Sequence, residues 1–263
     1  MLRADSLTLR YPHAGSALPV LQNFSLQVRP MDIIALLGPS GVGKSSLLRV
    51  LAGLQHAESG EVHVEGERLR GPHPALGFVF QDPSLLPWLN LRDNVGFGMD
   101  FKHQPNLDAQ TRQSRIDQAL REVGLTDAQT RYPGELSGGM AQRTALARTL
   151  VREPRLLLLD EPFSALDEVT RAQMQDLVLS IARAHQTAVV MVTHDIDEAL
   201  RMANRIILLG GKPGEQIGEW CIELEHPRDD AIDALEATRL DILHTLRRAR
   251  TQRPTHPTVS LTQ

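Results

Sequence analysis

Residues 38–45 read GPSGVGKS, and this stretch decides the fold. It fits the pattern G-x-x-x-x-G-K-[ST], in which backbone N–H groups of a glycine-rich loop surround phosphate oxygens. Glycine is needed there because a Cβ atom would block the close approach of backbone to phosphate. An apolar run, IIALL, precedes the loop, and a helix-like run, SLLRVLAG, follows it. This context favours a nucleotide phosphate site over the alternative, a glycine-rich turn with a chance lysine.

Two side chains of this loop suit specific roles. Lys44 would reach the β- and γ-phosphates of a nucleotide, and the Ser45 hydroxyl would bind Mg²⁺. Kinases, GTPases and motor ATPases all share such a loop, so it does not by itself identify the reaction.

Two further apolar runs end in polar groups that suit the same site. RLLLLD (155–160) predicts a buried strand that delivers Asp160 to the carboxyl edge of a sheet, where ligands bind in open α/β folds. Asp160 suits Mg²⁺ coordination, and Glu161 suits accepting a proton from an attacking water. AVVMVT (188–193) leads in the same way to His194, which is suited to contact the γ-phosphate. The alternative is that each strand ends in a solvated polar turn.

A second candidate anion site lies in GELSGGMAQR (134–143). Ser137, Gly138 and Gly139 stand before a helix-like run, and exposed N–H groups at a helix start favour phosphate. This stretch has no lysine, and the chain already holds a complete phosphate loop. The sequence therefore raises the question of whose phosphate the second site binds.

Composition indicates a globular chain without excess positive charge. The 263 residues are 41% hydrophobic, and the net charge is -4 with a pI near 6.2. A general nucleic-acid binder usually shows a basic excess, so we expect no nucleic-acid partner. The single cysteine, Cys221, excludes an intrachain disulfide and fits a reducing cytoplasmic location. No apolar run approaches the roughly 18–20 residues that span a bilayer, so we expect any membrane link to come through a partner.

The pattern along the chain predicts an α/β core with an inserted helical lobe. Short apolar runs separated by helix-like stretches are typical of a parallel sheet. The N-terminal third alternates apolar and polar residues, which predicts half-buried strands. Residues 82–155 are more polar and helix-like, and we interpret them as the lobe. Beyond residue 216 a tail helix is predicted from apolar residues at helical spacing, namely Ile232, Leu235, Ile242, Leu243 and Leu246. We expect it to dock on its own domain, with a partner contact as the alternative.

Taken in order, these stretches resemble an ABC transporter ATPase subunit over residues 1 to about 215. GPSGVGKSS resembles the Walker A loop, and LLLLDEP resembles the Walker B strand with its catalytic glutamate. FVFQD, LSGGM, SALD (164–167) and THD are similar to the Q-loop, signature, D-loop and switch-histidine loop. The chain departs from the commoner signature at Met140, where the family more often has glutamine. We expect this difference to alter packing more than phosphate binding.

The resemblance implies a P-loop NTPase (RecA-like) α/β core with an antiparallel β subdomain and an inserted α-helical subdomain. On this basis residues 1–81 and 156–215 form the ATP-binding core, and 82–155 form the helical signature subdomain. Residues 216–263 form a short C-terminal helical extension and polar tail.

The resemblance also implies ATP and Mg²⁺ as cofactors and assigns a role to each matching residue. Glu161, His194 and Gln81 are the implied catalytic residues, and Ser45, Gln81 and Asp160 the implied Mg²⁺ ligands. Tyr11 is placed to stack on adenine. The other implied ATP-binding residues are Gly38, Pro39, Ser40, Gly41, Gly43, Lys44, Ser45 and Ser46, together with Ser137, Gly138 and Gly139 of the signature.

Partners follow from the same resemblance. Such subunits pair head-to-tail, so that the signature of one copy closes over ATP held by Lys44 of the other. The loop Leu85–Trp88 is expected to dock a polytopic membrane permease, with packing of the helical lobe as the alternative. LLPWLNLRDNV and the short tail resemble importers of the nitrate, taurine and aliphatic-sulfonate type. This implies uptake of a small anionic solute, a separate solute-binding protein, and a peripheral place on the cytoplasmic face of the inner or plasma membrane.

Three other functions are alternatives to transport. A soluble ABC-type ATPase that acts on DNA or ribosomes would usually carry long coiled-coil insertions or a second ATPase domain, and neither is visible. A nucleotide sensor without turnover is disfavoured by Glu161 and His194. A P-loop kinase leaves LSGG and SALD unexplained.

Overall fold

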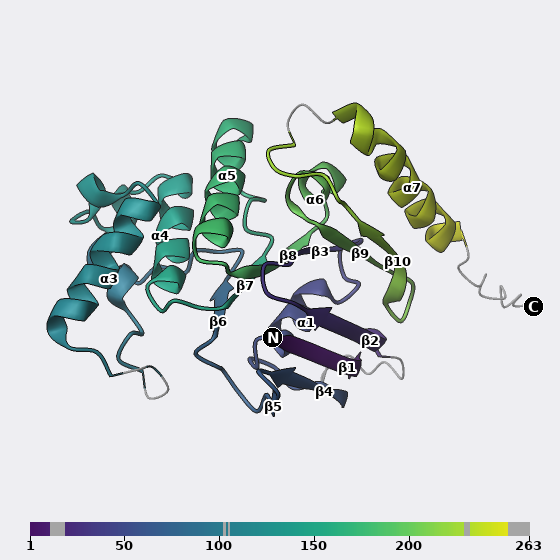
Figure 1. Ribbon diagram of the computed structural model, residues 1–263, viewed down its shortest axis with the longest axis horizontal. Coiled ribbons are helices and arrows are strands. Elements are labelled where there is room, and N and C mark those ends of the chain that lie inside the picture. The colour runs from purple at the N-terminus through teal and green to yellow at the C-terminus, as the bar shows by residue number, and fades with distance from the viewer. Residues whose placement is uncertain (11–18, 102–103, 105, 229–231, 252–263) are drawn as a thin grey trace, which may run out of the picture.

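A six-stranded sheet forms the centre of the protein, with the strand order β10-β9-β3-β8-β7-β6 (Figure 1). The structure is a computed structural model, and it describes residues 1–10, 19–101, 104, 106–228 and 232–251. Five strands run parallel, and β10 pairs antiparallel with β9. The strands are β3 (Ile33–Leu37), β6 (Leu76–Val79), β7 (Leu156–Asp160), β8 (Ala188–Thr193), β9 (Arg205–Gly210) and β10 (Glu215–Cys221). The predicted α/β core with a mostly parallel sheet is confirmed.

A smaller antiparallel sheet, in the order β2-β1-β4-β5, lies below the central sheet in Figure 1. Its strands are β1 (Leu2–Leu9), β2 (Leu21–Val28), β4 (Ser59–Val64) and β5 (Glu67–Arg68). Helix α1 (Lys44–Leu51) lies between the two sheets and contacts β1, β7 and β8. The phosphate loop therefore leads into a helix that packs against a sheet on each side.

Strand β3 explains why the parallel strands are continuous apolar runs. All five of its residues are buried. Ile34 and Leu36 pack in the hydrophobic cluster shared with α1 and the small sheet. Ala35 and Leu37 pack on the other face with α5 (Glu168–Ala184) and α6 (Ile196–Met202). Because side chains alternate between the faces of a strand, a sheet covered on both faces needs apolar residues at every position.

The helical lobe contains α2 (Leu91–Gly96), α3 (Ala109–Glu122) and α4 (Gly138–Leu150). In Figure 1, α3 and α4 lie at the left, beyond the edge strand β6. Two short 3₁₀ turns, Thr126–Ala128 and Pro133–Glu135, connect them. The side chain of Asp108 accepts a hydrogen bond from Thr111 N, which satisfies a free donor where α3 begins. The helix-like pattern of residues 82–155 thus corresponds to three helices.

The C-terminal helix α7 (Ile232–Thr251) docks on its own chain, as predicted. It contacts α6, β9 and β10, and Leu235 and Ile242 are buried. Trp220 of β10 donates to Asp241 at 2.8 Å, and Arg239 pairs with Asp197 at 2.7 Å. The polar tail after Thr251 and the side chain of Ile232 lie outside the described residues.

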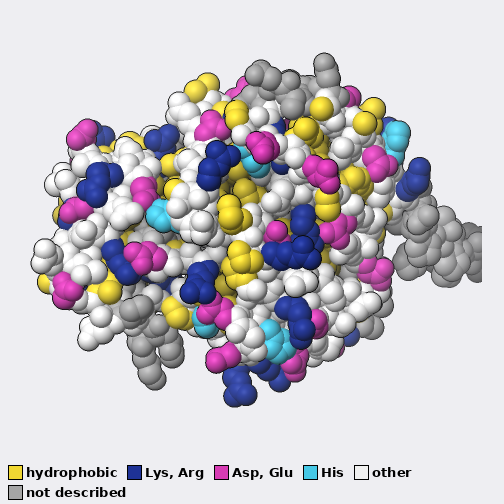
Figure 2. Space-filling model, in the orientation of Figure 1, with side chains coloured by type: hydrophobic (Ala, Val, Ile, Leu, Met, Phe, Trp, Pro, Cys, Tyr) yellow, Lys and Arg dark blue, Asp and Glu magenta, His cyan; other side chains and the backbone are white. Residues whose placement is uncertain are grey.

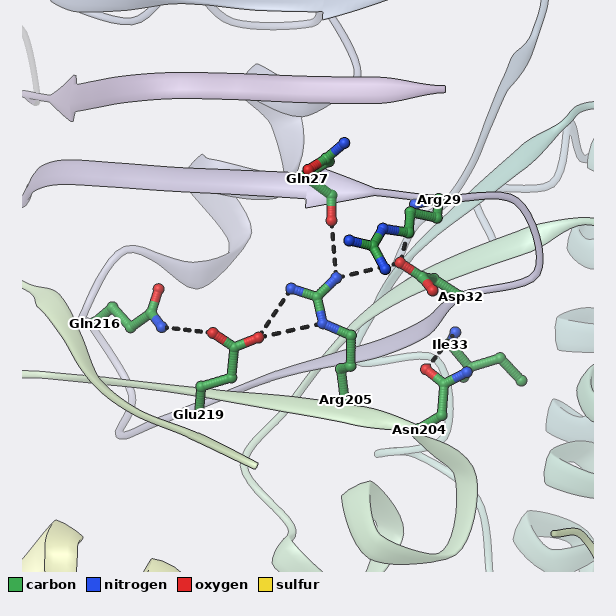
Figure 3. Close-up of polar contacts among 8 residues, drawn as sticks. All are labelled: Gln27, Arg29, Asp32, Ile33, Asn204, Arg205, Gln216 and Glu219. Carbon is green, nitrogen blue, oxygen red and sulfur yellow. Dashed lines mark hydrogen bonds and ion pairs between the residues drawn. The ribbon is translucent and has the colours of Figure 1, made fainter. Parts of the chain in front are cut away.

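Arg205 joins the central sheet to the small one (Figure 3). From β9 its guanidinium donates to Glu219 of β10 at 2.9 Å and to the carbonyl of Gln27 in β2 at 2.8 Å. It also pairs with Asp32, just before β3, at 3.2 Å.

The division of the chain into three parts, predicted from the sequence, remains our proposal. Its boundary at residue 216 falls inside β10, which belongs to the central sheet.

Candidate nucleotide site

The phosphate loop connects β3 to α1 and has the open form that phosphate needs. Gly41 (φ 81°) and Gly43 (φ 102°) are left-handed, a conformation that other residues rarely adopt. A Cβ atom at Gly38 would lie 2.5 Å from the carbonyl oxygen of Leu209, so only glycine fits there. Around Gly41, by contrast, no described heavy atom other than those of Gly41 and its two chain neighbours lies within 4 Å of the place that a Cβ would take. Ser40 and Gly41 are exposed at the tip, with Pro39 half-buried beside them.

Lys44, the first residue of α1, is held against this loop. Its Nζ donates to the carbonyl of Gly38 at 2.8 Å and to that of Pro39 at 3.1 Å. Burial lowers the pKa of Lys44, and the carboxylates of Glu161 and Asp160 oppose that change. The ammonium is therefore close to both carboxylates and directly beside the open loop. Ser46, two residues further along α1, is buried.

Ser45 and Asp160 place two oxygen atoms together at the end of β7. The Ser45 hydroxyl donates to Oδ1 of Asp160 at 2.7 Å, and Arg49 lies 3.9 Å from Oδ2. Hydroxyl and carboxylate oxygens are the ligands that Mg²⁺ prefers. Neighbouring ligands of an octahedral Mg²⁺ lie roughly 3 Å apart, because each bond is about 2.1 Å long. The pair therefore fits a Mg²⁺ ion that would take the place of the hydrogen bond between them.

Glu161 directly follows β7, His194 directly follows the neighbouring strand β8, and the two side chains lie close together. Nδ1 of His194 is 3.4 Å from Oε2 of Glu161. The backbone of Glu161 is left-handed at φ 45°, and its N–H donates to the carbonyl of Val192 in β8 at 3.1 Å. Residues held in such sparsely populated conformations cluster at active sites. His194 is exposed, so its ring can reach a ligand.

Gln81 is connected to Glu161 through Ser164, a residue to which we assigned no role from the sequence. The Gln81 amide donates to the Ser164 hydroxyl at 3.3 Å, and that hydroxyl donates to the carbonyl of Glu161 at 3.0 Å. The position of Ser164 three residues after Glu161 is compatible with such a turn. Sequence spacing alone does not reveal that Gln81 lies beside it.

The signature residues lie on a different part of the molecule. Ser137 is exposed and precedes α4, where its Oγ accepts from Met140 N at 3.3 Å. Gly138 is also exposed, and Gly139 faces Thr170 of α5, whose Cγ2 would be 2.6 Å from an added Cβ. In Figure 1, α4 and α1 are separated, with β7 and α5 between them. Met140 packs against the hydrophobic cluster, as expected, while the effect on phosphate binding stays a prediction.

The structure thus brings the predicted residues into two groups. Lys44, Ser45, Asp160, Glu161, His194 and Gln81 are linked through close contacts, and Ser137, Gly138 and Gly139 stand apart from them. Tyr11, predicted to stack on adenine, lies outside the described residues. Sequence reasoning also missed Glu198, which lies behind His194 in the first turn of α6.

Comparisons with known proteins show the family of the chain. The model of the ABC transporter family matches residues 21–164. The aliphatic sulfonates import ATP-binding protein SsuB 1 of Xanthomonas axonopodis pv. citri is 49% identical over 230 residues, covering 86% of this chain and 90% of that protein. The SsuB protein of Bacillus subtilis is 41% identical over 224 residues, covering 85% of this chain and 86% of that protein.

Solved structures show the same fold. The dimeric post-hydrolysis structure of the ATP-binding cassette MJ0796, bound to ADP and Pi, has a TM-score of 0.74 and 30% identity. The match covers 86% of this chain and all of that one. CbiO1 from Clostridium perfringens, part of the ABC transporter complex cbiONQ, has a TM-score of 0.74 and 25% identity, covering 95% of this chain and 97% of that one. The predicted P-loop NTPase fold with its two subdomains is confirmed, and the chain belongs to the ABC transporter family as one of its ATP-hydrolysing, ATP-binding subunits.

Proposed function

We propose that the chain is the nucleotide-binding subunit of an ABC importer, which hydrolyses ATP to energise uptake of a small anionic solute. The observation that carries the proposal is the linked set around Lys44, in which Mg²⁺ ligands and a candidate base adjoin one phosphate loop. The solute class, of the nitrate, taurine or sulfonate type, is supported by relatives whose names are those of aliphatic sulfonate import proteins.

The residues of this set divide the work of hydrolysis. The phosphate loop and Lys44 bind the β- and γ-phosphates, and Ser45, Asp160 and Gln81 would hold Mg²⁺. When bound, Mg²⁺ supplies positive charge that neutralises charge developing on the phosphate oxygens. Glu161 orients the attacking water and accepts its proton on a carboxylate oxygen. His194, 3.4 Å from that carboxylate, contacts the γ-phosphate and keeps the water in line.

A second copy of the chain completes each site. Ser137 and Gly138 are exposed at the start of α4, where N–H groups favour anions, yet no lysine accompanies them. In the proposed dimer, Ser137, Gly138 and Gly139 of one copy close over the ATP that Lys44 of the other copy holds. The dimeric state of the MJ0796 cassette supports this arrangement.

The proposed docking surface for a membrane permease follows Gln81. Trp88 is 70% exposed, which disfavours the alternative that it packs the lobe, whereas Leu85 is half-buried against the hydrophobic cluster. A cavity of about 350 Å³ is lined by Leu89, which follows Trp88 in the chain, and by the exposed rings of Phe97 and Phe101. Exposed aromatic side chains near a hollow suit a partner's helix.

Membrane attachment through such a partner fits the helices of this chain. None that the structure describes is long and apolar enough to cross a bilayer. Acidic and basic side chains are interspersed on the face that Figure 2 shows. We propose a peripheral place on the cytoplasmic face of the membrane, with a separate solute-binding protein delivering the solute.

Co-purification from membranes tests this function. The chain should bring down a polytopic permease, and ATP-driven uptake of an aliphatic sulfonate by the reconstituted complex should stop in the Lys44→Ala variant. A chain that hydrolyses ATP but never co-purifies with a membrane protein would support the soluble alternative instead.

A further inference from the structure

Glu198 is hydrogen-bonded to both residues that flank His194. The Thr193 hydroxyl donates to Oε2 of Glu198 at 2.8 Å, and Asp195 N donates to the Thr193 hydroxyl at 3.0 Å. The N–H of Glu198 in turn donates to Oδ1 of Asp195 at 3.2 Å. The backbone on either side of His194 is therefore fixed by one closed set of bonds, and the only long side chain in the set is that of Glu198.

Glu198 also shares a cavity with the residues proposed for catalysis. This cavity has a volume of about 110 Å³, and Glu161, His194 and Glu198 are among the residues that line it. Glu198 makes no contribution to the hydrolysis mechanism described above, although it lines the same space. A group in this place can influence both the position of His194 and the charge near Glu161.

The surroundings of Glu198 favour its neutral form. Its Oε1 has no access to solvent and no hydrogen-bond partner among the atoms that the structure describes. Burial raises the pKa of Glu198 to about 7, the Thr193 hydroxyl opposes the rise, and the carboxylate of Asp195 adds to it. The charged or titratable groups that face it are Asp195 of its own turn, Arg171 of α5, Glu161 after β7 and His194 after β8. A buried carboxylate with an unpaired oxygen beside two other carboxylates is costly.

We propose that Glu198 is a positioning residue for His194 and that it acts as a neutral carboxylic acid. The inference rests on the proposed roles of Glu161 and His194. In its neutral form Glu198 holds the Thr193 hydroxyl without adding negative charge beside Glu161 and the incoming γ-phosphate. When Glu198 ionises, its unpaired oxygen must find a donor or water, so the loop rearranges and His194 leaves its position.

The test is the pH profile of ATP hydrolysis at saturating ATP, from about pH 6 to about pH 9. In the wild type, kcat should fall as pH rises above about 7, approaching tenfold per pH unit if only the neutral form is active. Glu198→Gln, which accepts from Thr193 but cannot ionise, should keep wild-type kcat at low pH and lose the alkaline fall. Thr193→Val, which removes the hydroxyl link, should lower kcat at every pH with little change in KM. Asp197→Asn, an exposed neighbour that pairs with Arg239, is the matched control and should follow the wild type.

Two results would overturn the proposal. One is an unchanged alkaline fall in Glu198→Gln. The other is a folded Glu198→Gln, with wild-type ATP affinity, that is slow at every pH, because the carboxylate would then be the required form. If Glu198→Gln does not fold, wild-type kcat in Thr193→Val overturns it. Failure of the proposed catalytic roles is seen separately, as wild-type turnover in Glu161→Gln or His194→Ala.

Discussion

The phosphate loop and the signature both offer backbone N–H groups where a helix begins, but they are built differently. At the phosphate loop, Lys44 and Ser45 are held by contacts within the chain, to Gly38 and Asp160. At the signature, Ser137 is exposed and its side chain accepts a hydrogen bond from the N–H of Met140 in its own helix. The fold thus completes the first region, whereas in the proposed dimer the second region is completed by the ATP that another copy holds.

The largest expected effect is in the first region. Glu161→Gln should lower turnover by about 10²–10⁴-fold, because the amide cannot accept the proton of the attacking water. ATP binding should persist and trap a dimer. Phosphate release and light scattering measure the two outcomes, with Glu168→Gln, an exposed residue of α5, as the control. Turnover at the wild-type rate would show that Glu161 is not the base.

Ser137→Arg should lower hydrolysis by about 10²-fold, because the long cation crowds the ATP held by the other copy. Each monomer should still bind ATP, whereas Lys44→Ala should not. Mixing the two variants sharpens the comparison, since one site of the mixed dimer then has both residues intact. Hydrolysis should therefore reappear on mixing. If the mixture of the two inactive variants stays inactive, the result contradicts a site that is shared between two copies.

Trp88→Ala should weaken docking of the permease by about 2 kcal/mol, roughly thirtyfold, as is typical of an aromatic anchor at an interface. Basal hydrolysis should be unaffected, and the free energy of unfolding should change by less than about 0.5 kcal/mol because Trp88 is 70% exposed. The control is Leu85→Ala, which is half-buried and should destabilise the fold instead. A Trp88→Ala variant that unfolds easily would identify Trp88 as a packing residue.

An effect of about the same size is expected on the dependence of stability on pH. The pKa of Glu198 is raised from 4.5 to about 7, so between these values the folded chain binds more protons than the unfolded chain. The free energy of unfolding therefore falls as pH rises through this window, by about 2 kcal/mol after allowance for partial solvent access. Glu198→Gln should remove this loss, so its stability relative to the wild type should rise between about pH 5 and about pH 8. Chemical denaturation of both proteins at both pH values measures the difference. An equal change in the free energy of unfolding of the two proteins with pH would contradict the prediction.

Sequence was sufficient where function depends on consecutive residues. The phosphate loop, Asp160 and Glu161 each follow an apolar strand directly, and parallel strands end at one edge of a sheet, so their meeting was predictable. The existence of strand β10 was not predictable, because its sequence EQIGEWC is largely polar and mostly exposed. This strand lies antiparallel at the edge of the sheet. Glu198 and Ser164 were also missed, since their importance depends on which oxygen is buried and which neighbour lies within bonding distance. Spacing along the chain does not carry that information.

The left-handed backbone of Glu161 has a consequence for how hydrolysis begins. At φ 45° a glutamate costs on the order of 1 kcal/mol more than a glycine would, and the bond to Val192 helps to hold it there. The loss of conformational entropy on fixing this backbone therefore belongs to folding, and turnover does not repeat it. In the proposed mechanism, the backbone that carries the base is already in place when ATP binds, and the adjustment left to each cycle is the approach of the second copy.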